Sequence, residues 1–69
     1  MNTLIDKKVI GQRLRTLRGS RTQTEVAAAI GVTKMAISQY EQGERIPQDE
    51  IKIKIANYFK KSVTEIFFS

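Results

Sequence analysis

Apolar residues recur every three to four positions along most of the chain, and this spacing predicts helices rather than strands. The first such segment runs from about Asp6 to Arg18. Its apolar positions share one helical face: Val9, Ile10, Leu14 and Leu17. Asp6 has the short acceptor side chain that suits the residue preceding a helix. The pattern therefore predicts a first helix with a single buried face.

Local start and stop signals predict the second and third helices. Thr22 and Glu25 have the Thr-x-x-Glu spacing of a capping box, and Gly31 is suited to end a helix in the left-handed conformation. Thr33 is a second threonine at an expected helix start, and Gly43 follows at the expected end. These signals predict two short helices joined by a tight turn.

The segment between Pro47 and Lys61 has an ambiguous pattern. Charged and apolar residues alternate strictly over 50–55, which is typical of a half-buried strand. Apolar residues also recur every four positions, at Ile51, Ile55 and Phe59, and the sequence offers no second strand for pairing. We interpret this segment as a helix, which leaves Ile53 off its main apolar face.

A fifth helix is expected after Ser62, which forms another capping-box pair with Glu65. Its apolar residues are Val63, Ile66 and Phe67. No linker, repeat or low-complexity stretch divides the chain. The sequence therefore predicts one compact all-α domain over residues 1–69.

Composition excludes several classes of chemistry. The 69 residues include no Cys, His or Trp, which rules out a disulfide framework, a thiolate nucleophile, a zinc ribbon and a histidine base. The adjacent carboxylates Asp49 and Glu50 stand at an expected helix start, where the helix dipole explains them. We therefore expect no enzyme activity, metal, cofactor or small-molecule ligand. The lack of a long apolar run or leader-like start predicts a cytoplasmic protein without membrane contact.

The chain is basic, with 12 Lys and Arg against 7 Asp and Glu, for a net charge of +5. Most of the excess lies in residues 1–45, which carry a net charge of +4. A positive surface suits an anionic partner such as nucleic acid. Arg13, Arg15 and Arg21 are interpreted as solubilising charges.

Residues 23–42 contain the most informative motif. Counting Gln23 as the first position, small Ala27 is fifth and Gly31 is ninth. Apolar residues occupy the fourth, eighth, tenth, fifteenth and eighteenth positions: Val26, Ile30, Val32, Ile37 and Tyr40. Two helices that cross steeply need a small residue at their contact and a glycine in the turn. This pattern predicts a helix-turn-helix whose second helix has a polar outer face.

The order of motifs resembles the phage repressor/Cro-type (Xre) helix-turn-helix DNA-binding family. The resembling stretches are 10–15, 22–27, 31–33, 37–43, 47, 55–56 and 62–67. The resemblance implies a five-helix, lambda-repressor-like domain that acts as a dimer on a two-fold operator. Three features depart from the family pattern: a shorter link between residues 18 and 23, polar residues at Asp49 and Lys52, and Lys60 in place of a helix-ending glycine.

Four outer-face residues are predicted to read bases: Lys34, Met35, Ser38 and Gln39. The resemblance places Met35 at a base-reading position, where it can pack on a thymine methyl group; the alternative is a core methionine. Gln39 can pair with adenine through both amide atoms, and Lys34 can reach guanine or a phosphate. Ser38 is small enough to allow a close approach to a base edge.

Phosphate contacts are predicted for Gln23, Thr33, Gln42, Arg45 and Arg18. Gln23 and Thr33 stand at helix starts, where backbone amides favour phosphate oxygens, although simple capping is an alternative. The resemblance implies that Arg45 contacts a phosphate, and the alternative is that it is a solvated loop charge. The resemblance also implies a pair between Arg18 and Glu41 that orients the recognition helix, unless Glu41 is merely solvated.

A self-association patch is predicted from the surplus of apolar residues near the C-terminal end: Ile53, Val63, Ile66 and Phe68. Phe68 could instead fold back onto the core. Together these observations predict a sequence-specific regulator that binds double-stranded DNA as a homodimer, most simply a repressor. The alternative is a protein-interaction module, such as an antitoxin-like or polymerase-contacting partner.

Overall fold

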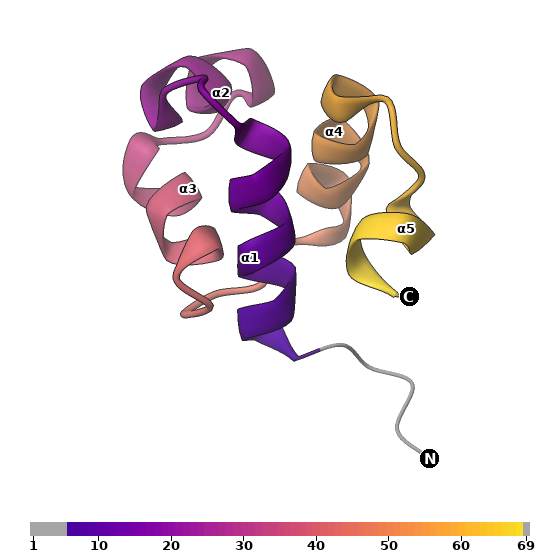
Figure 1. The fold of residues 1–69 in the computed structure, drawn as a ribbon. Coiled ribbons are helices and arrows are strands. Elements are labelled where there is room, and N and C mark those ends of the chain that lie inside the picture. The colour runs from indigo at the N-terminus through magenta and orange to yellow at the C-terminus, as the bar shows by residue number, and fades with distance from the viewer. Residues whose placement is uncertain (1–5, 69) are drawn as a thin grey trace.

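The computed structural model describes residues 6–68, which form α-helices joined by short turns and contain no strand (Figure 1). In chain order the helices are α1 (Lys7–Arg18), α2 (Gln23–Ile30), α3 (Lys34–Glu41), α4 (Asp49–Phe59) and α5 (Val63–Phe67). This confirms the predicted all-α class and the order of its helices.

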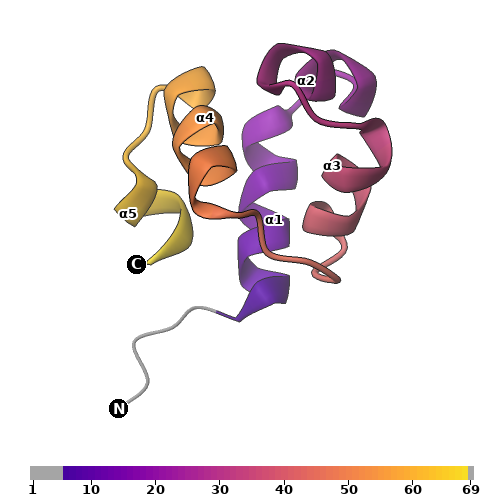
Figure 2. The same ribbon diagram turned by 180° about the vertical axis from the view of Figure 1, so that it is seen from behind.

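Helix α1 lies between the α2–α3 pair and the α4–α5 pair (Figures 1 and 2). It packs against α3 on one side and against α5 on the other, while α4 contacts both α2 and α5. The buried apolar residues form one cluster: Ile10, Leu14, Val26, Ala27, Ile30, Ala36, Ile37, Tyr40, Ile55, Ala56, Ile66 and Phe67. A single core therefore fixes the position of α3 relative to the other helices.

Side-chain caps start four of the helices at the predicted residues, although at α2 only the Thr22 half of the predicted capping box is formed. Asp6, Thr22 and Thr33 each accept a hydrogen bond from an amide of the first turn, at 2.8, 3.0 and 3.1 Å. At α5 the capping box is complete, because Ser62 Oγ accepts from the Glu65 amide at 3.0 Å and Glu65 Oε1 accepts from the Ser62 amide at 2.9 Å. These bonds satisfy amides that have no partner inside a helix.

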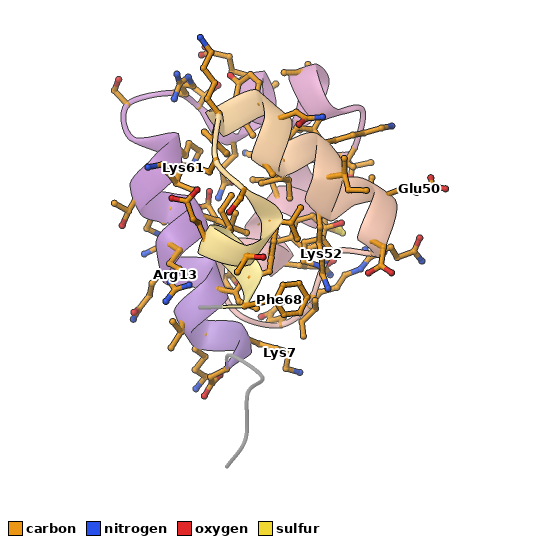
Figure 3. The ribbon with its side chains drawn as sticks, turned by 90° about the vertical axis from the view of Figure 1, so that its right-hand side faces the viewer. Lys7, Arg13, Glu50, Lys52, Lys61 and Phe68 are labelled. Atoms are coloured by element: carbon orange, nitrogen blue, oxygen red, sulfur yellow. The ribbon has the colours of Figure 1, made fainter. Side chains whose placement is uncertain are left out.

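The alternating segment of α4 is a helix, as its four-residue spacing predicted. Ile55 is 1% exposed, whereas Ile53 is 52% exposed and lies off the apolar face. Lys52 is half-buried, and its ammonium lies 3.6 Å from Asp49 Oδ1. The same ammonium lies 5.0 Å from the centre of the Phe68 ring (Figure 3). The ammonium is paired with an exposed carboxylate and faces an aromatic ring, so a lysine is accommodated there.

Helix α4 ends in a left-handed residue that is not glycine. Lys60 has φ 59° and ψ 44°, and its amide donates to Asn57 O at 3.3 Å. The left-handed conformation costs a residue with a side chain about 1–2 kcal/mol. Lys60 therefore forms the turn in place of the glycine that the resemblance implies, and the turn costs some stability.

Of the three arginines interpreted as solubilising charges, Arg13 and Arg21 join distant segments of the fold. Arg13 Nη1 donates to Glu65 O at 3.0 Å and to Ile66 O at 3.2 Å, and thereby ties α1 to the end of α5. The Arg21 guanidinium lies 5.5 Å from the centre of the Tyr58 ring, which links the α1–α2 turn to the end of α4. The sequence did not show these contacts because both join segments far apart along the chain.

The predicted self-association patch needs correction. Ile66 is 2% exposed and belongs to the core, and Val63 is partly buried against that core. Helix α5 packs on its neighbours through these side chains, so Ile66 is not available on the surface and Val63 is available only in part. Of the predicted set, Ile53 and Phe68 are exposed, Phe68 at 45%.

Candidate nucleic-acid interface

Helices α2 and α3 form the helix-turn-helix. Gly31 adopts the left-handed conformation at φ 85°, and its amide donates to Ala27 O at 2.8 Å. Ala27 is 3% exposed, where its small side chain lets the two helices pack closely. The Thr33 cap then starts α3 directly after the turn. The chain reversal thus depends on the glycine, the alanine and the threonine that the motif contains.

The outer face of α3 carries the predicted base-reading residues. Lys34 and Met35 are exposed, and Ser38 and Gln39 are half-buried. Met35 is 70% exposed, which excludes the alternative that it belongs to the core. Ala36, Ile37 and Tyr40 point into the core instead. One helix therefore holds an inward apolar face and an outward polar face.

Two of the outer side chains are held by polar neighbours. Gln42 Nε2 donates to Ser38 Oγ at 2.9 Å, one helical turn away. Arg45 Nη1 donates to Gln39 Oε1 at 3.4 Å from the turn that follows α3. Neither contact was predicted from the sequence. They limit the conformations that these side chains adopt before any partner binds.

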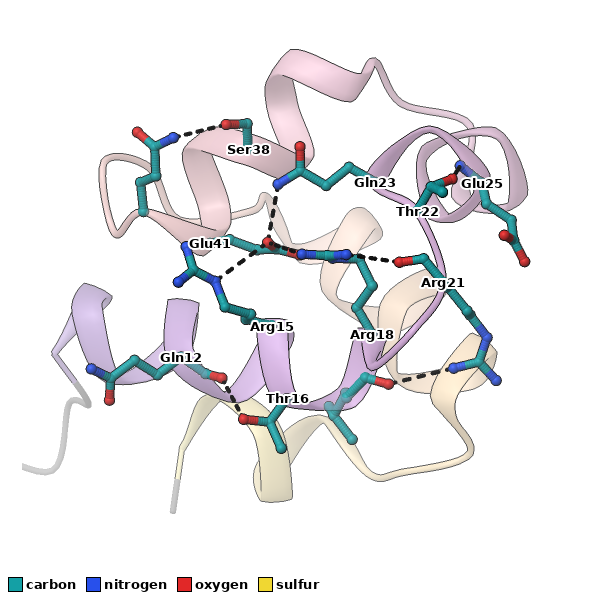
Figure 4. A network of polar contacts seen from close by, with 12 residues as sticks. Gln12, Arg15, Thr16, Arg18, Arg21, Thr22, Gln23, Glu25, Ser38 and Glu41 are labelled. Carbon is teal, nitrogen blue, oxygen red and sulfur yellow. Dashed lines mark hydrogen bonds and ion pairs between the residues drawn. The ribbon is translucent and has the colours of Figure 1, made fainter.

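A buried carboxylate joins α1, α2 and α3 (Figure 4). Glu41 is 5% exposed and accepts from Arg18 Nε at 2.6 Å and from Arg18 Nη2 at 3.0 Å. Gln23 Nε2 donates to the same carboxylate at 3.1 Å, and Arg15 Nε lies 3.8 Å away. The structure thus brings Arg18 and Glu41 together and adds Gln23 and Arg15, whose contacts with Glu41 the sequence analysis missed.

The charges of this network favour its ionised form. Burial by itself raises the pKa of Glu41, but hydrogen bonds from Arg18 and Gln23, together with the nearby charges of Arg18 and Arg15, hold the pKa below its ordinary value. The hydrogen bond to Glu41 in turn raises the pKa of Arg18. The pair therefore stays charged at neutral pH, and α3 is fixed to α1 by a two-bond ionic contact.

The contact between α1 and α3 is close enough to require a glycine. A Cβ atom built on Gly11 would lie 2.4 Å from Glu41 O and 2.7 Å from Tyr40 O. Both are backbone atoms, so neither can rotate away. Sequence reasoning missed this role, although one signal was present: glycine is unfavourable inside a helix and is retained there for a reason.

Within residues 6–68 no group of three or more Asp and Glu side chains is arranged to hold a metal ion. None of the helices there combines the length and apolar character that crossing a bilayer requires.

Comparisons with known proteins identify what this geometry is similar to. The sequence matches the family model HTH_3, helix-turn-helix, over residues 12–66. No curated protein sequence matches the chain.

Several solved structures have the same fold. The P22 c2 repressor in complex with a synthetic operator is 27% identical, with a TM-score of 0.81, over 84% of this chain and 91% of that one. The restriction-modification controller protein C.AhdI from Aeromonas hydrophila is 28% identical, with a TM-score of 0.81, over 90% and 97%. The SOS-response repressor LexA from Eubacterium rectale, at 24% identity and a TM-score of 0.83 over 88% and 67%, shares the fold.

Proposed function

Because the chain belongs to the helix-turn-helix family, we propose that it is a sequence-specific DNA-binding transcriptional regulator that reads the major groove with α3. The observation that carries the proposal is the outward face of α3, where Lys34 and Met35 are exposed, on a helix whose inner face packs on the core and is tied to α1 by the pair of Glu41 and Arg18. The major groove of B-DNA, about 12 Å wide, admits such a helix.

In this proposal Lys34, Met35, Ser38 and Gln39 contact base edges. Met35 offers an exposed apolar surface for a thymine methyl group, and Lys34 offers a donor. The side chains differ in chemistry, which is what discrimination among base pairs requires. Each good base contact contributes about 1–3 kcal/mol of discrimination.

The backbone of the duplex is contacted from the helix starts and from the turn after α3. The first amides of α2 and α3, beside Gln23 and Thr33, point outward and favour phosphate oxygens. Gln42 and Arg45 are exposed at the other end of α3. Arg18 uses three of its five N–H donors on Glu41 and Arg21, which leaves two for a phosphate.

We further propose that two copies bind a two-fold operator. One recognition helix reads about 4–5 base pairs, too few to specify one site among the very large number in a genome. Two copies on half-sites about 34 Å apart supply the missing discrimination. Ile53 and Phe68 are both exposed, and they are the side chains we assign to contact between copies.

The P22 c2 repressor, solved with a synthetic operator, supports a repressor that acts by occupying its site. The family and these solved relatives are regulators rather than enzymes, and they do not favour the alternative of a protein-interaction module. We assign this regulator to the cytoplasm, as expected from the sequence.

Selection from a random pool of duplexes tests the proposal. We expect the chain to enrich a two-fold sequence, and its affinity for that sequence to fall about a hundredfold between about 50 and 200 mM salt, because bound cations are released from the phosphates. An unenriched pool, or an affinity that does not respond to salt, contradicts DNA binding as the function.

Sedimentation tests the contact between copies. The wild-type chain is expected to form a dimer on its enriched duplex, and Ile53→Asp to weaken that assembly because it places a charge in the apolar contact. Ala28→Asp adds the same charge at an exposed position of α2 and serves as the control. Equal assembly of both variants would mean that Ile53 lies outside the contact between copies.

A further inference from the structure

The turn after α3 is held in place beside the recognition helix. The Glu44 amide donates to Gln39 O at 2.9 Å, and the Gly43 amide donates to Tyr40 O at 3.2 Å. Gly43 has φ 74°, and a Cβ atom there would lie 2.9 Å from Lys8 Cα. The turn is therefore pressed against α1 and has little freedom to move relative to α3.

Arg45 extends from this turn and contacts two residues of α3. Its Nη1 donates to Gln39 Oε1 at 3.4 Å. Its guanidinium carbon lies 5.8 Å from the centre of the Tyr40 ring, within the range of a cation–π contact. Tyr40 is 3% exposed and cannot shift without disturbing the core. The aromatic ring and the fixed turn together place the arginine beside the Gln39 amide.

This contact determines which end of the Gln39 amide is oxygen. Arginine has only donors, so the amide atom that faces it must be the acceptor oxygen. The amide is planar, so a bond that draws Oε1 toward Arg45 occupies one lone pair of the oxygen and turns the NH₂ group away from Arg45. A bidentate pair with adenine needs both amide atoms aligned with the base edge, and the bond from Arg45 competes with that alignment.

We propose that Arg45 is a positioning residue that orients the Gln39 amide as a donor, so that this position of the operator selects guanine rather than adenine. Guanine presents two acceptors, N7 and O6, in the major groove, whereas adenine presents one acceptor and one donor. The proposal rests on DNA binding by α3 and differs from the adenine pairing expected from the sequence alone. It assigns Arg45 a role in specificity in addition to its phosphate contact.

Base preference at a single position is the test. The enriched duplex is first scanned with wild type and with Gln39→Ala, and the base pair whose preference disappears in Gln39→Ala is the one that Gln39 reads. At that base pair the wild type is expected to prefer guanine to adenine about tenfold. Arg45→Met, which removes the donors but keeps a long side chain over Tyr40, is expected to bring the ratio close to one.

Two controls separate orientation from loss of charge. Lys34→Met removes a cation from the same face without a contact with Gln39, and it is expected to weaken binding while the ratio at the Gln39 base pair stays unchanged. In the Gln39→Ala background, Arg45→Met is expected to alter the ratio no further. Circular dichroism checks that the variants fold, and Arg45→Ala repeats the test with a different replacement.

The outcomes distinguish this inference from the proposed function. A wild type that prefers adenine at the Gln39 base pair, or an Arg45→Met variant that keeps the guanine preference, overturns the role of Arg45 while DNA binding stands. A wild type without preference at any position overturns the proposed function and this inference with it.

Discussion

Gly11→Ala is expected to destabilise the fold by about 2 kcal/mol and to weaken DNA binding by more than about tenfold. The added methyl group would meet the backbone oxygens of Glu41 and Tyr40 at 2.4 and 2.7 Å, so α3 must move away from α1. Overpacking against backbone atoms costs about 3 kcal/mol, and the preference of a helix for alanine over glycine offsets only about 1 kcal/mol of it. Urea denaturation and a titration with the enriched duplex measure the two effects.

Gly31→Ala is the matched control, because the same substitution there meets open space. Gly31 has φ 85° and no atom within 4 Å of the position of a Cβ. The backbone conformation costs alanine about 1–2 kcal/mol, but α3 is not displaced. The Gly31 variant should therefore lose stability and, once folded, bind DNA within a few-fold of wild type. Similar losses of affinity in both variants would contradict the displacement of α3.

Glu41→Gln is expected to cost about 2–4 kcal/mol of stability, because it leaves the Arg18 charge without its partner. The carboxylate is buried and the Arg18 side chain is 19% exposed, so water only partly compensates for the loss. Glu44→Gln, at an exposed position of the next turn, is the control and should change stability by less than about 0.5 kcal/mol. Urea denaturation of both variants compares them.

A double-mutant cycle with Arg18→Met separates the interaction between Glu41 and Arg18 from unrelated losses of stability. If the carboxylate and the guanidinium stabilise each other, the double variant loses clearly less than the sum of the single losses. Strict additivity would mean that the two residues act independently, in spite of their two hydrogen bonds.

The contribution of Glu41 also depends on pH in a defined direction. Its pKa is lowered in the folded chain, so its stabilising effect is present above the ordinary glutamate pKa of about 4.3 and is lost as the pH falls through the lower, folded value. The hydrogen bond from the Ser62 amide lowers the pKa of Glu65 in the same way. The difference in stability between wild type and Glu41→Gln reports the contribution of Glu41 alone. We expect this difference to shrink only below a pH of about 4.3.

Local features of the fold could be predicted from the sequence. The caps at Thr22, Thr33 and Ser62 and the left-handed Gly31 depend on residues within one turn of each other, so short-range rules were sufficient. The helical state of α4 required a choice between two periodicities, and the four-residue spacing of its apolar residues decided correctly.

Features that depend on contacts between distant segments could not be predicted. Gly11 is needed only because another helix crosses at that residue, and Arg15 and Gln23 reach Glu41 from separate helices. Ile66 was assigned to the surface because the sequence shows how many apolar residues α5 has but not which of them face α1 and α4. The contact between Arg45 and Gln39 could not be predicted for the same reason, because it depends on the path of the turn after α3.

In α3 the inward residues anchor the helix and the outward residues face solvent, which has a consequence for how such proteins diversify. Ile37, Tyr40 and Glu41 anchor the helix, while Lys34 and Met35 have no part in that anchoring. Exchanging the outward residues therefore leaves the scaffold intact, and new target sequences can arise by a few surface substitutions. Ser38 and Gln39 are the exceptions, because their partners Gln42 and Arg45 lie outside the helix, so a change at either position also affects the partner.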